Sequence, residues 1–175
     1  MIQIMFVCTG NICRSPLAHR LLEKELDERG FGDRVRVESS GIGAWHLGDD
    51  ADPRMRRTAA AHGVELHHPA RQLGVQDVDQ YDLLFAMDHG HYREILSLAG
   101  SGGGPGAVPA VREKLYVFRQ FDPELTSGDE LLPRKMAPDV PDPYYGGAQG
   151  FEDVFAMVER TCRGIVDRIA KGALP

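Results

Sequence analysis

The sequence predicts an α/β protein built on an open parallel sheet of about four strands, with helices on both faces. Short apolar segments alternate along the chain with longer segments whose apolar residues recur at helical spacing. Parallel strands need crossover connections of this kind, and the crossover helices cover the faces of the sheet. The chain has 175 residues, enough for a substantial core, and we expect a single domain over residues 1–175.

Four strands and four main helices are expected in alternating order. The strands are predicted at residues 2–7, 35–39, 81–87 and 114–118, and the helices at residues 16–29, 52–62, 89–98 and 151–169. Ser15 is a good N-cap for the first helix, Pro16 suits its first position, and Gly30 ends it. The last helix has the strongest pattern, because its apolar residues keep helical spacing throughout.

Two stretches show neither pattern. Residues 100–109 are rich in Gly and Pro, which predicts a mobile surface loop. Residues 119–150 are rich in Pro, Asp and Gly and form a long connection before the last helix. Connections of that length inside compact domains are usually functional or disordered. We favour a functional role for the second stretch, because it carries Asp142-Pro143-Tyr144-Tyr145.

The composition argues against several classes of protein. A formal net charge of −6 is unfavourable for non-specific binding to nucleic acid. No apolar run reaches the length of a membrane span, and the N-terminal residues do not resemble a signal peptide. Three cysteines make a poor disulfide framework, so we expect a reduced, cytoplasmic protein. The paired histidines at 67–68 and 89–91 lack the spacing of a zinc site, and no metal is expected.

Residues 7–16, Val-Cys-Thr-Gly-Asn-Ile-Cys-Arg-Ser-Pro, are the most informative segment. They must form a tight loop, because an apolar strand precedes them and a helix start follows. Such a loop directs backbone N–H groups into a concavity at a helix N-terminus, which attracts anions. Arg14 adds a planar guanidinium that can bind two phosphate oxygens at once. Cys8 enters the same positive field, which favours its thiolate and predicts a nucleophile that attacks phosphorus.

The same segment differs from the nucleotide-binding P-loop. That loop requires the pattern G-x-x-x-x-G-K-[ST], in which a Lys reaches the phosphates and a hydroxyl holds magnesium. Here Gly10 is the only glycine, there is no Lys, and a Cys lies in the loop. We therefore expect no cofactor. The predicted reaction is attack of the thiolate on a phosphomonoester, giving a phosphocysteine that water hydrolyses.

The segment from Cys8 to Pro16, together with Asp142-Pro143-Tyr144-Tyr145, resembles the low-molecular-weight protein tyrosine phosphatases. The resemblance extends over most of the chain and implies a flavodoxin-like fold and phosphotyrosine-containing protein substrates. It implies that Cys8 is the nucleophile and that Arg14 binds the phosphate and the transition state. It also implies that Asp142 is the general acid that protonates the leaving group.

The remaining site residues follow from the same resemblance. The loop residues expected to bind phosphate are Thr9, Gly10, Asn11, Ile12, Cys13, Arg14 and Ser15. Ser39 and His68 match the positions that brace Asn11, and the Ser15 hydroxyl is expected to hydrogen-bond the thiolate. The residues expected to wall the substrate cleft are Ile12, Trp45, Tyr144 and Tyr145. A deep aromatic slot holds a phosphotyrosine ring, whereas the shorter phosphoserine cannot reach the nucleophile.

Several roles have alternatives. Spacing does not choose between Asp139 and Asp142 as the acid, and the resemblance selects Asp142. Cys13 is either inert packing or a thiol that captures oxidised Cys8 in a disulfide, and the resemblance favours the second. The basic residues Arg54, Arg56 and Arg57 could favour acidic peptides, although a solvated helix face is the commoner reason for such a cluster.

Three other functions are compatible with parts of the pattern. Arsenate reductases share a similar loop, but their chemistry needs further cysteines, and only Cys162 is left, on the apolar face of the last helix. Phosphoarginine phosphatases resemble the loop but carry Thr at the position of Ile12, so an apolar Ile12 favours an aromatic substrate. A binding module without activity is expected to lack Cys8, Arg14 or Asp142, and all three are present. Nothing in the sequence indicates the oligomeric state.

Overall fold

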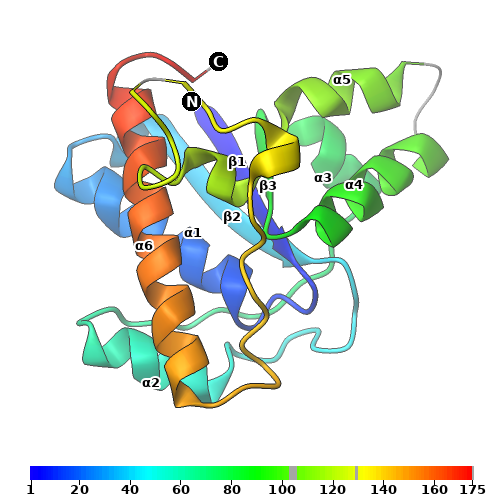
Figure 1. Ribbon diagram of the computed structural model, residues 1–175. Helices are drawn as coiled ribbons and strands as arrows, with labels where there is room; N and C mark the ends of the chain where they lie inside the picture. Colours follow the sequence, from blue (N-terminus) through cyan, green and yellow to red (C-terminus); the bar gives the residue numbers. More distant parts are fainter. Residues whose placement is uncertain (103–105, 129, 175) are drawn as a thin grey trace.

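A four-stranded parallel sheet forms the centre of the computed structural model, which describes residues 1–102, 106–128 and 130–174 (Figure 1). The strands lie in the order β2-β1-β3-β4. Their bounds are β1 Ile2–Cys8, β2 Val35–Gly41, β3 Leu83–Ala86 and β4 Leu115–Val117. Ile4 of the central strand β1 lies opposite Val37 of β2 and Leu83 of β3. The predicted fold class is confirmed.

Helices cover both faces of the sheet (Figure 1). One face carries α1 (Arg14–Glu28), α2 (Pro53–Ala61) and α6 (Ala148–Ala170), and the other carries α3 (Val75–Gln80), α4 (His89–Gly102) and α5 (Ala107–Lys114). Ile4 and Phe6 of β1 join the core beneath α1 and α6, whereas Met5 and Val7 join the core beneath α4. Successive side chains of a strand point to opposite faces. A strand covered on both faces is therefore apolar on both, as β1 is over its buried residues 4–8.

The prediction of a surface loop over residues 100–109 is wrong at both ends. α4 continues to Gly102 and α5 begins at Ala107, while residues 103–105 lie outside the described residues. α4 continues because Ala99, in its last turn, is buried in the core, and α5 forms because Val111 is buried against the same core. Pro109 is compatible with α5 because it lies in the first turn, where a backbone N–H has no intrahelical partner.

α3 and the ends of two strands also differ from the prediction. α3 has no periodic signal, because Val78 is its one buried residue. β3 and β4 are shorter than predicted because residues at their expected ends belong to neighbouring helices. Tyr81 caps α3, Lys114 ends α5, and Phe118 begins a 3-10 helix.

The long connection predicted before α6 is present. In the described residues between β4 and α6, the helical turns are the 3-10 helices Phe118–Phe121 and Arg134–Met136. Asp122 anchors its start, because the buried carboxylate accepts hydrogen bonds from Arg119 and Arg160. No helix within the described ranges is long and apolar enough to cross a bilayer.

The carboxyl ends of β1 and β3 are the natural place for a site in this sheet. The chain leaves β1 for β2 on one side and later returns to β3 on the other side, so the connections diverge between β1 and β3. Ligands of open parallel sheets bind in the crevice formed at such a point. β1 ends at Cys8, and Asp88 follows β3 by two residues.

Candidate active site

Residues 9–13 connect β1 to α1 and form the floor of the site. Asn11 is the only non-glycine residue of the described chain with a positive φ, 58°, a conformation that asparagine tolerates better than most residues. α1 begins at Arg14 with Cys13 as its N-cap, so the prediction of Ser15 as the N-cap is wrong. The reason is that the Ser15 hydroxyl is engaged elsewhere. It lies 3.0 Å from Cys8 Sγ and accepts a hydrogen bond from Asn11 Nδ2 at 2.9 Å.

The side chain of Asn11 holds this loop in shape. Its Nδ2 donates to Ser15 Oγ at 2.9 Å and to Ser39 Oγ at 3.0 Å. Its Oδ1 lies 2.9 Å from His68 Nε2 and accepts the Arg71 backbone N–H at 2.9 Å. Burial, followed by the nearby His19, lowers the pKa of His68 to about 4, so its ring is neutral at pH 7. The structure thus brings Ser39 and His68 against Asn11, behind the loop.

The backbone of the loop leaves a row of N–H groups unpaired. Carbonyl oxygens of the loop accept hydrogen bonds from N–H groups outside it, in the pairs Cys8–Ile42, Thr9–Gly43 and Ile12–Asp52. Within the part of the chain that the structure describes, the backbone N–H groups of residues 10–15 donate to no protein acceptor. Unpaired donors at the N-terminus of a helix attract an anion. Cys8, which is 3% exposed, lies at the base of this loop.

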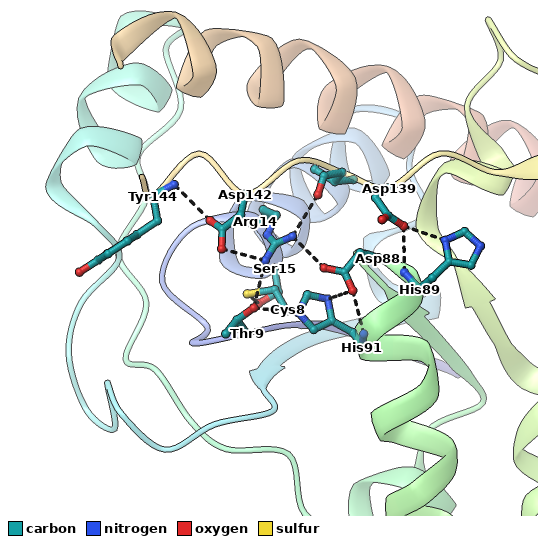
Figure 2. Close-up of polar contacts among 11 residues, drawn as sticks. Cys8, Thr9, Arg14, Ser15, Asp88, His89, His91, Asp139, Asp142 and Tyr144 are labelled. Atoms are coloured by element: carbon teal, nitrogen blue, oxygen red, sulfur yellow. Dashed lines mark hydrogen bonds and ion pairs between the residues drawn. The ribbon is translucent and has the colours of Figure 1, made fainter. Parts of the chain in front are cut away.

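Arg14 is buried beside the loop, and its guanidinium is bonded on several sides (Figure 2). Nη1 donates to Asp88 Oδ2 at 3.1 Å and to the Val140 carbonyl oxygen at 3.0 Å. Nη2 donates to Thr9 Oγ1 at 3.1 Å and to Asp142 Oδ2 at 3.3 Å. These partners come from the loop, from the end of β3 and from the connection before α6. The guanidinium is therefore oriented by three separate segments.

The two candidate acids occupy different places (Figure 2). Asp142 lies against the Arg14 guanidinium and lines the pocket described below. Asp139 pairs with His89 instead, through contacts of 2.7 Å to Nδ1 and 2.9 Å to the backbone N–H. Burial opposes ionisation of Asp139, but the hydrogen bonds from His89 outweigh it and lower the pKa of that carboxyl. Asp139 is thus a hydrogen-bond partner of His89 at the start of α4, and Asp142 is the carboxyl group that faces the pocket.

A pocket of about 320 Å³ opens above the loop. Its lining residues are Cys8, Thr9, Gly10, Ile12, Cys13, Arg14, Trp45, His46, Asp142, Tyr144 and Tyr145. Trp45 is 73% exposed and Tyr145 is 90% exposed, so their rings have free faces. Asn11 and Ser15, which were also predicted to bind phosphate, do not line the pocket. They are fully buried behind the loop and could reach an anion only through their backbone N–H groups.

Three residues near the pocket were not predicted from the sequence. His46 contributes to the pocket lining. Asp88 accepts a hydrogen bond from the Arg14 guanidinium at 3.1 Å and another from the backbone N–H of His91 at 2.7 Å. His91 Nε2 lies 2.8 Å from Thr9 Oγ1, and burial lowers the pKa of His91 to about 4. Asp88 could have been predicted as a site residue, because it lies just beyond a buried strand. Nothing in the sequence marks His46 or His91 as site residues.

The other two cysteines are buried free thiols. Cys162 lies in the core beneath α6, as predicted. Cys13 lines the pocket, and burial raises the pKa of both thiols well above the ordinary value. A buried, protonated Cys13 fits the packing interpretation, and its capture of oxidised Cys8 stays a prediction.

The fold and the site together define a class of protein. A cysteine at the base of an unpaired N–H loop, an oriented arginine and a carboxyl group facing the same pocket are the parts of a cysteine-dependent phosphatase. The family model described as "Low molecular weight phosphotyrosine protein phosphatase" matches residues 3–173. The chain therefore belongs to that family.

Individual relatives agree with this assignment. A protein from Streptomyces coelicolor named low molecular weight protein-tyrosine-phosphatase is 40% identical over 166 residues, which cover 94% of this chain and 91% of the relative. The crystal structure of a protein tyrosine phosphatase from Entamoeba histolytica has a TM-score of 0.84 at 28% identity, covering 99% of this chain and 100% of its own. A structure named arginine phosphatase has a TM-score of 0.77 at 25% identity, covering 97% of each chain.

Proposed function

We propose that this protein hydrolyses phosphotyrosine in protein substrates through a phosphocysteine intermediate. The observation that carries the proposal is the shared pocket. It has Cys8, Arg14 and Asp142 in its lining and the rings of Tyr144 and Tyr145 at its walls. A phosphoryl group bound by the loop amides would lie beside Cys8, and its aryl group would extend along these two rings, which pack edge-on against each other with centroids 5.0 Å apart.

In the first step, Cys8 Sγ attacks phosphorus in line with the tyrosine oxygen. The S–P bond forms as the O–P bond breaks, and the electron pair leaves with the tyrosine oxygen. That oxygen takes a proton from the Asp142 carboxyl group. The N–H groups of residues 10–15 and the guanidinium of Arg14 hold the equatorial phosphoryl oxygens, over which the negative charge is spread in the transition state.

In the second step, water replaces the leaving group. The ionised Asp142 takes a proton from this water as the water oxygen attacks phosphorus. The S–P bond breaks, Cys8 regains its thiolate, and inorganic phosphate leaves. The contact of 3.0 Å between Ser15 Oγ and Cys8 Sγ supports both steps, because the Ser15 hydroxyl, which also lies 3.3 Å from the Ser40 carbonyl oxygen, can turn to donate to the thiolate and stabilise it.

The lining of the pocket supports an aromatic substrate. Ile12 presents an apolar side chain beside the loop, and Trp45, Tyr144 and Tyr145 offer ring surface. The likeness to an arginine phosphatase makes phosphoarginine the substrate to test against. A guanidinium group gains polar partners from a hydroxyl but none from the Ile12 side chain, so phosphotyrosine is the better match.

Phosphate release from matched peptides tests the proposal. One peptide sequence is prepared with phosphotyrosine, phosphoserine or phosphoarginine, and turnover is measured for wild type, Cys8→Ser and the control Cys162→Ala. We expect turnover of the phosphotyrosine peptide, loss of turnover in Cys8→Ser and near wild-type turnover in Cys162→Ala. Faster turnover of the phosphoarginine peptide would contradict the substrate, and an active Cys8→Ser variant would contradict the mechanism.

The role of the acid has its own matched pair of variants. Asp142→Ala should lower kcat/KM most for aryl phosphates with poor leaving groups, because their departure in the first step needs the proton. Asp139→Ala removes a neighbouring carboxyl group that pairs with His89 and should change turnover little. An equal fall in kcat/KM for all leaving groups in Asp142→Ala would remove Asp142 from the acid role.

We also propose that the protein acts in the cytoplasm. The support is chemical: Cys8, Cys13 and Cys162 are all free thiols, which suits a reducing compartment. Recovery of the protein from membranes or from outside the cell, in a fractionation of its native host, would contradict this location.

A further inference from the structure

Arg54, the second residue of α2, contacts the segment that carries Asp142. Its Nη1 donates to the carbonyl oxygen of Tyr144 at 2.9 Å. Its guanidinium carbon lies 5.1 Å from the centroid of the Tyr144 ring and 4.8 Å from that of Phe151, near the start of α6. A guanidinium that is bonded to a backbone oxygen and stacked on two rings is held in one orientation. The solvated helix face expected from the sequence therefore does not describe Arg54.

Asp52 fixes the other edge of the same guanidinium. Its carboxylate accepts from Arg54 Nε at 3.0 Å and from Nη2 at 2.8 Å, and Asp52 is 6% exposed. Burial by itself would raise the pKa of Asp52, but the hydrogen bonds from Arg54 outweigh it and lower that pKa. The backbone N–H of Asp52 donates to the Ile12 carbonyl oxygen at 2.8 Å. A continuous set of contacts thus runs from the phosphate-binding loop through Asp52 and Arg54 to Tyr144.

Asp142 lies between two attachments of its segment. On the N-terminal side, the Val140 N–H donates to the Met87 carbonyl oxygen at 2.9 Å. On the C-terminal side, Arg54 holds Tyr144, whose N–H donates to Asp142 Oδ1 at 3.1 Å. Two glycines follow before α6, and glycine restricts the backbone least of all residues. The position of the Asp142 carboxyl group therefore depends on the attachment of Tyr144.

We propose that Arg54 is a positioning residue for the reaction. It fixes the Tyr144 wall and, through it, the place of the Asp142 carboxyl group, while Asp52 ties both to the phosphate-binding loop. The inference rests on the proposed function, in which Asp142 is the general acid. Arg54 does not line the pocket and acts only through Tyr144 and Asp52. Its loss should therefore matter most when the leaving group needs a proton.

Two aryl phosphates of similar size separate this role from a structural one. Para-nitrophenyl phosphate has a good leaving group, and phenyl phosphate has a poor one. In Arg54→Ala, we expect kcat/KM for phenyl phosphate to fall about 10- to 100-fold, the loss typical of a misplaced catalytic group. The kcat/KM for para-nitrophenyl phosphate, which reports only the step in which the leaving group departs, should fall much less. Inhibition by inorganic phosphate should be unchanged, because the phosphate-binding loop keeps its own support from Asn11.

Three further variants complete the design. Arg57→Ala removes a charge from the same helix and should behave as wild type. Arg54→Lys keeps a cation and should fall between wild type and Arg54→Ala, because an ammonium group cannot bond Asp52 bidentately and reach Tyr144 at once. Arg54→Lys also keeps the test open if Arg54→Ala folds poorly, which circular dichroism would reveal. In the Asp142→Ala background, Arg54→Ala should cause no further dependence on the leaving group.

The outcomes distinguish this inference from the proposed function. If Asp142→Ala itself shows no dependence on the leaving group, the acid role fails and the inference fails with it. If Asp142→Ala shows that dependence, but Arg54→Ala and Arg54→Lys lower kcat/KM for both substrates equally or not at all, the positioning role alone is overturned. Selective loss with phenyl phosphate in both Arg54 variants, absent in Arg57→Ala, supports it.

Discussion

Replacing Asn11 with alanine should destabilise both the phosphate-binding loop and the whole fold. Asn11 is fully buried, and its amide group makes polar contacts with Ser15, Ser39, His68 and the backbone of Arg71. It also holds a backbone conformation, at φ 58°, that alanine adopts only at a cost. Both effects act on the loop beneath Cys8.

The magnitude follows from these contacts. A hydrogen bond contributes about 1 kcal/mol net, and a buried group left without its partner costs about 1–3 kcal/mol. The left-handed backbone adds about 1–2 kcal/mol for alanine. With four hydrogen bonds lost and partial relaxation of the site, we expect Asn11→Ala to lower the free energy of unfolding by about 4 kcal/mol. That is a large share of the roughly 5–15 kcal/mol typical of natural domains.

Urea unfolding followed by circular dichroism measures this loss, and two related variants divide it into parts. Asn11→Gly removes the same hydrogen bonds but accepts the positive φ, so it should be about 1 kcal/mol more stable than Asn11→Ala. Ser39→Ala removes one partner and should cost about 1 kcal/mol. Phosphate binding should weaken in both Asn11 variants. A loss of less than about 1 kcal/mol in Asn11→Ala would refute the reasoning, because it would show that the buried network contributes little.

Two further predictions concern stability. Gly164→Ala should destabilise the protein strongly, because a Cβ there would lie 2.1 Å from the Phe121 carbonyl oxygen. In the control Gly150→Ala, the new Cβ meets nothing nearer than 4.0 Å. Equal unfolding temperatures for the two variants would contradict this prediction. Stability should also fall as the pH drops from about 6.5 towards 4. Burial lowers the pKa values of His68 and His91 to about 4, from an ordinary 6.5, so below pH 6.5 the unfolded chain binds more protons than the folded one. Above pH 6.5 both histidines are neutral in the folded and the unfolded state, so they do not make the free energy of unfolding depend on pH. A free energy of unfolding in urea that is the same at pH 7 and pH 4.5 would exclude this effect.

The parts of the fold that could be predicted from the sequence are those with a local, repeated signal. β1 is apolar on both faces because both faces are covered, and α6 has a continuous apolar stripe because one side packs on the sheet. α3 and α5 escaped prediction because each buries a single residue, too few to show a period. The N-cap of α1 was misplaced because the Ser15 hydroxyl bonds to Asn11 across the loop, a contact that helix propensity does not include.

The site shows the same division. The loop from Cys8 to Arg14 is contiguous, so its chemistry could be inferred from residue types alone. The contact between Arg14 and Asp142 joins positions 128 residues apart, and only the family resemblance pointed to it. Arg54 and Tyr144 are 90 positions apart, so a charged residue that the sequence assigned to solvent is held against the acid-bearing segment. Spacing along the chain contains no information on such contacts.

Direct detection of the covalent intermediate tests the central claim most directly. Asp142→Ala is mixed with para-nitrophenyl phosphate, whose leaving group departs without a proton, and the reaction is stopped in acid within its first turnovers. Without Asp142 to activate water, the intermediate should accumulate. Mass spectrometry of the digested protein should then find one phosphoryl group on Cys8 and none in the Asp142→Ala, Cys8→Ser double variant. A protein that releases phosphate while Cys8 stays unmodified, with the label absent or on another residue, would contradict the account.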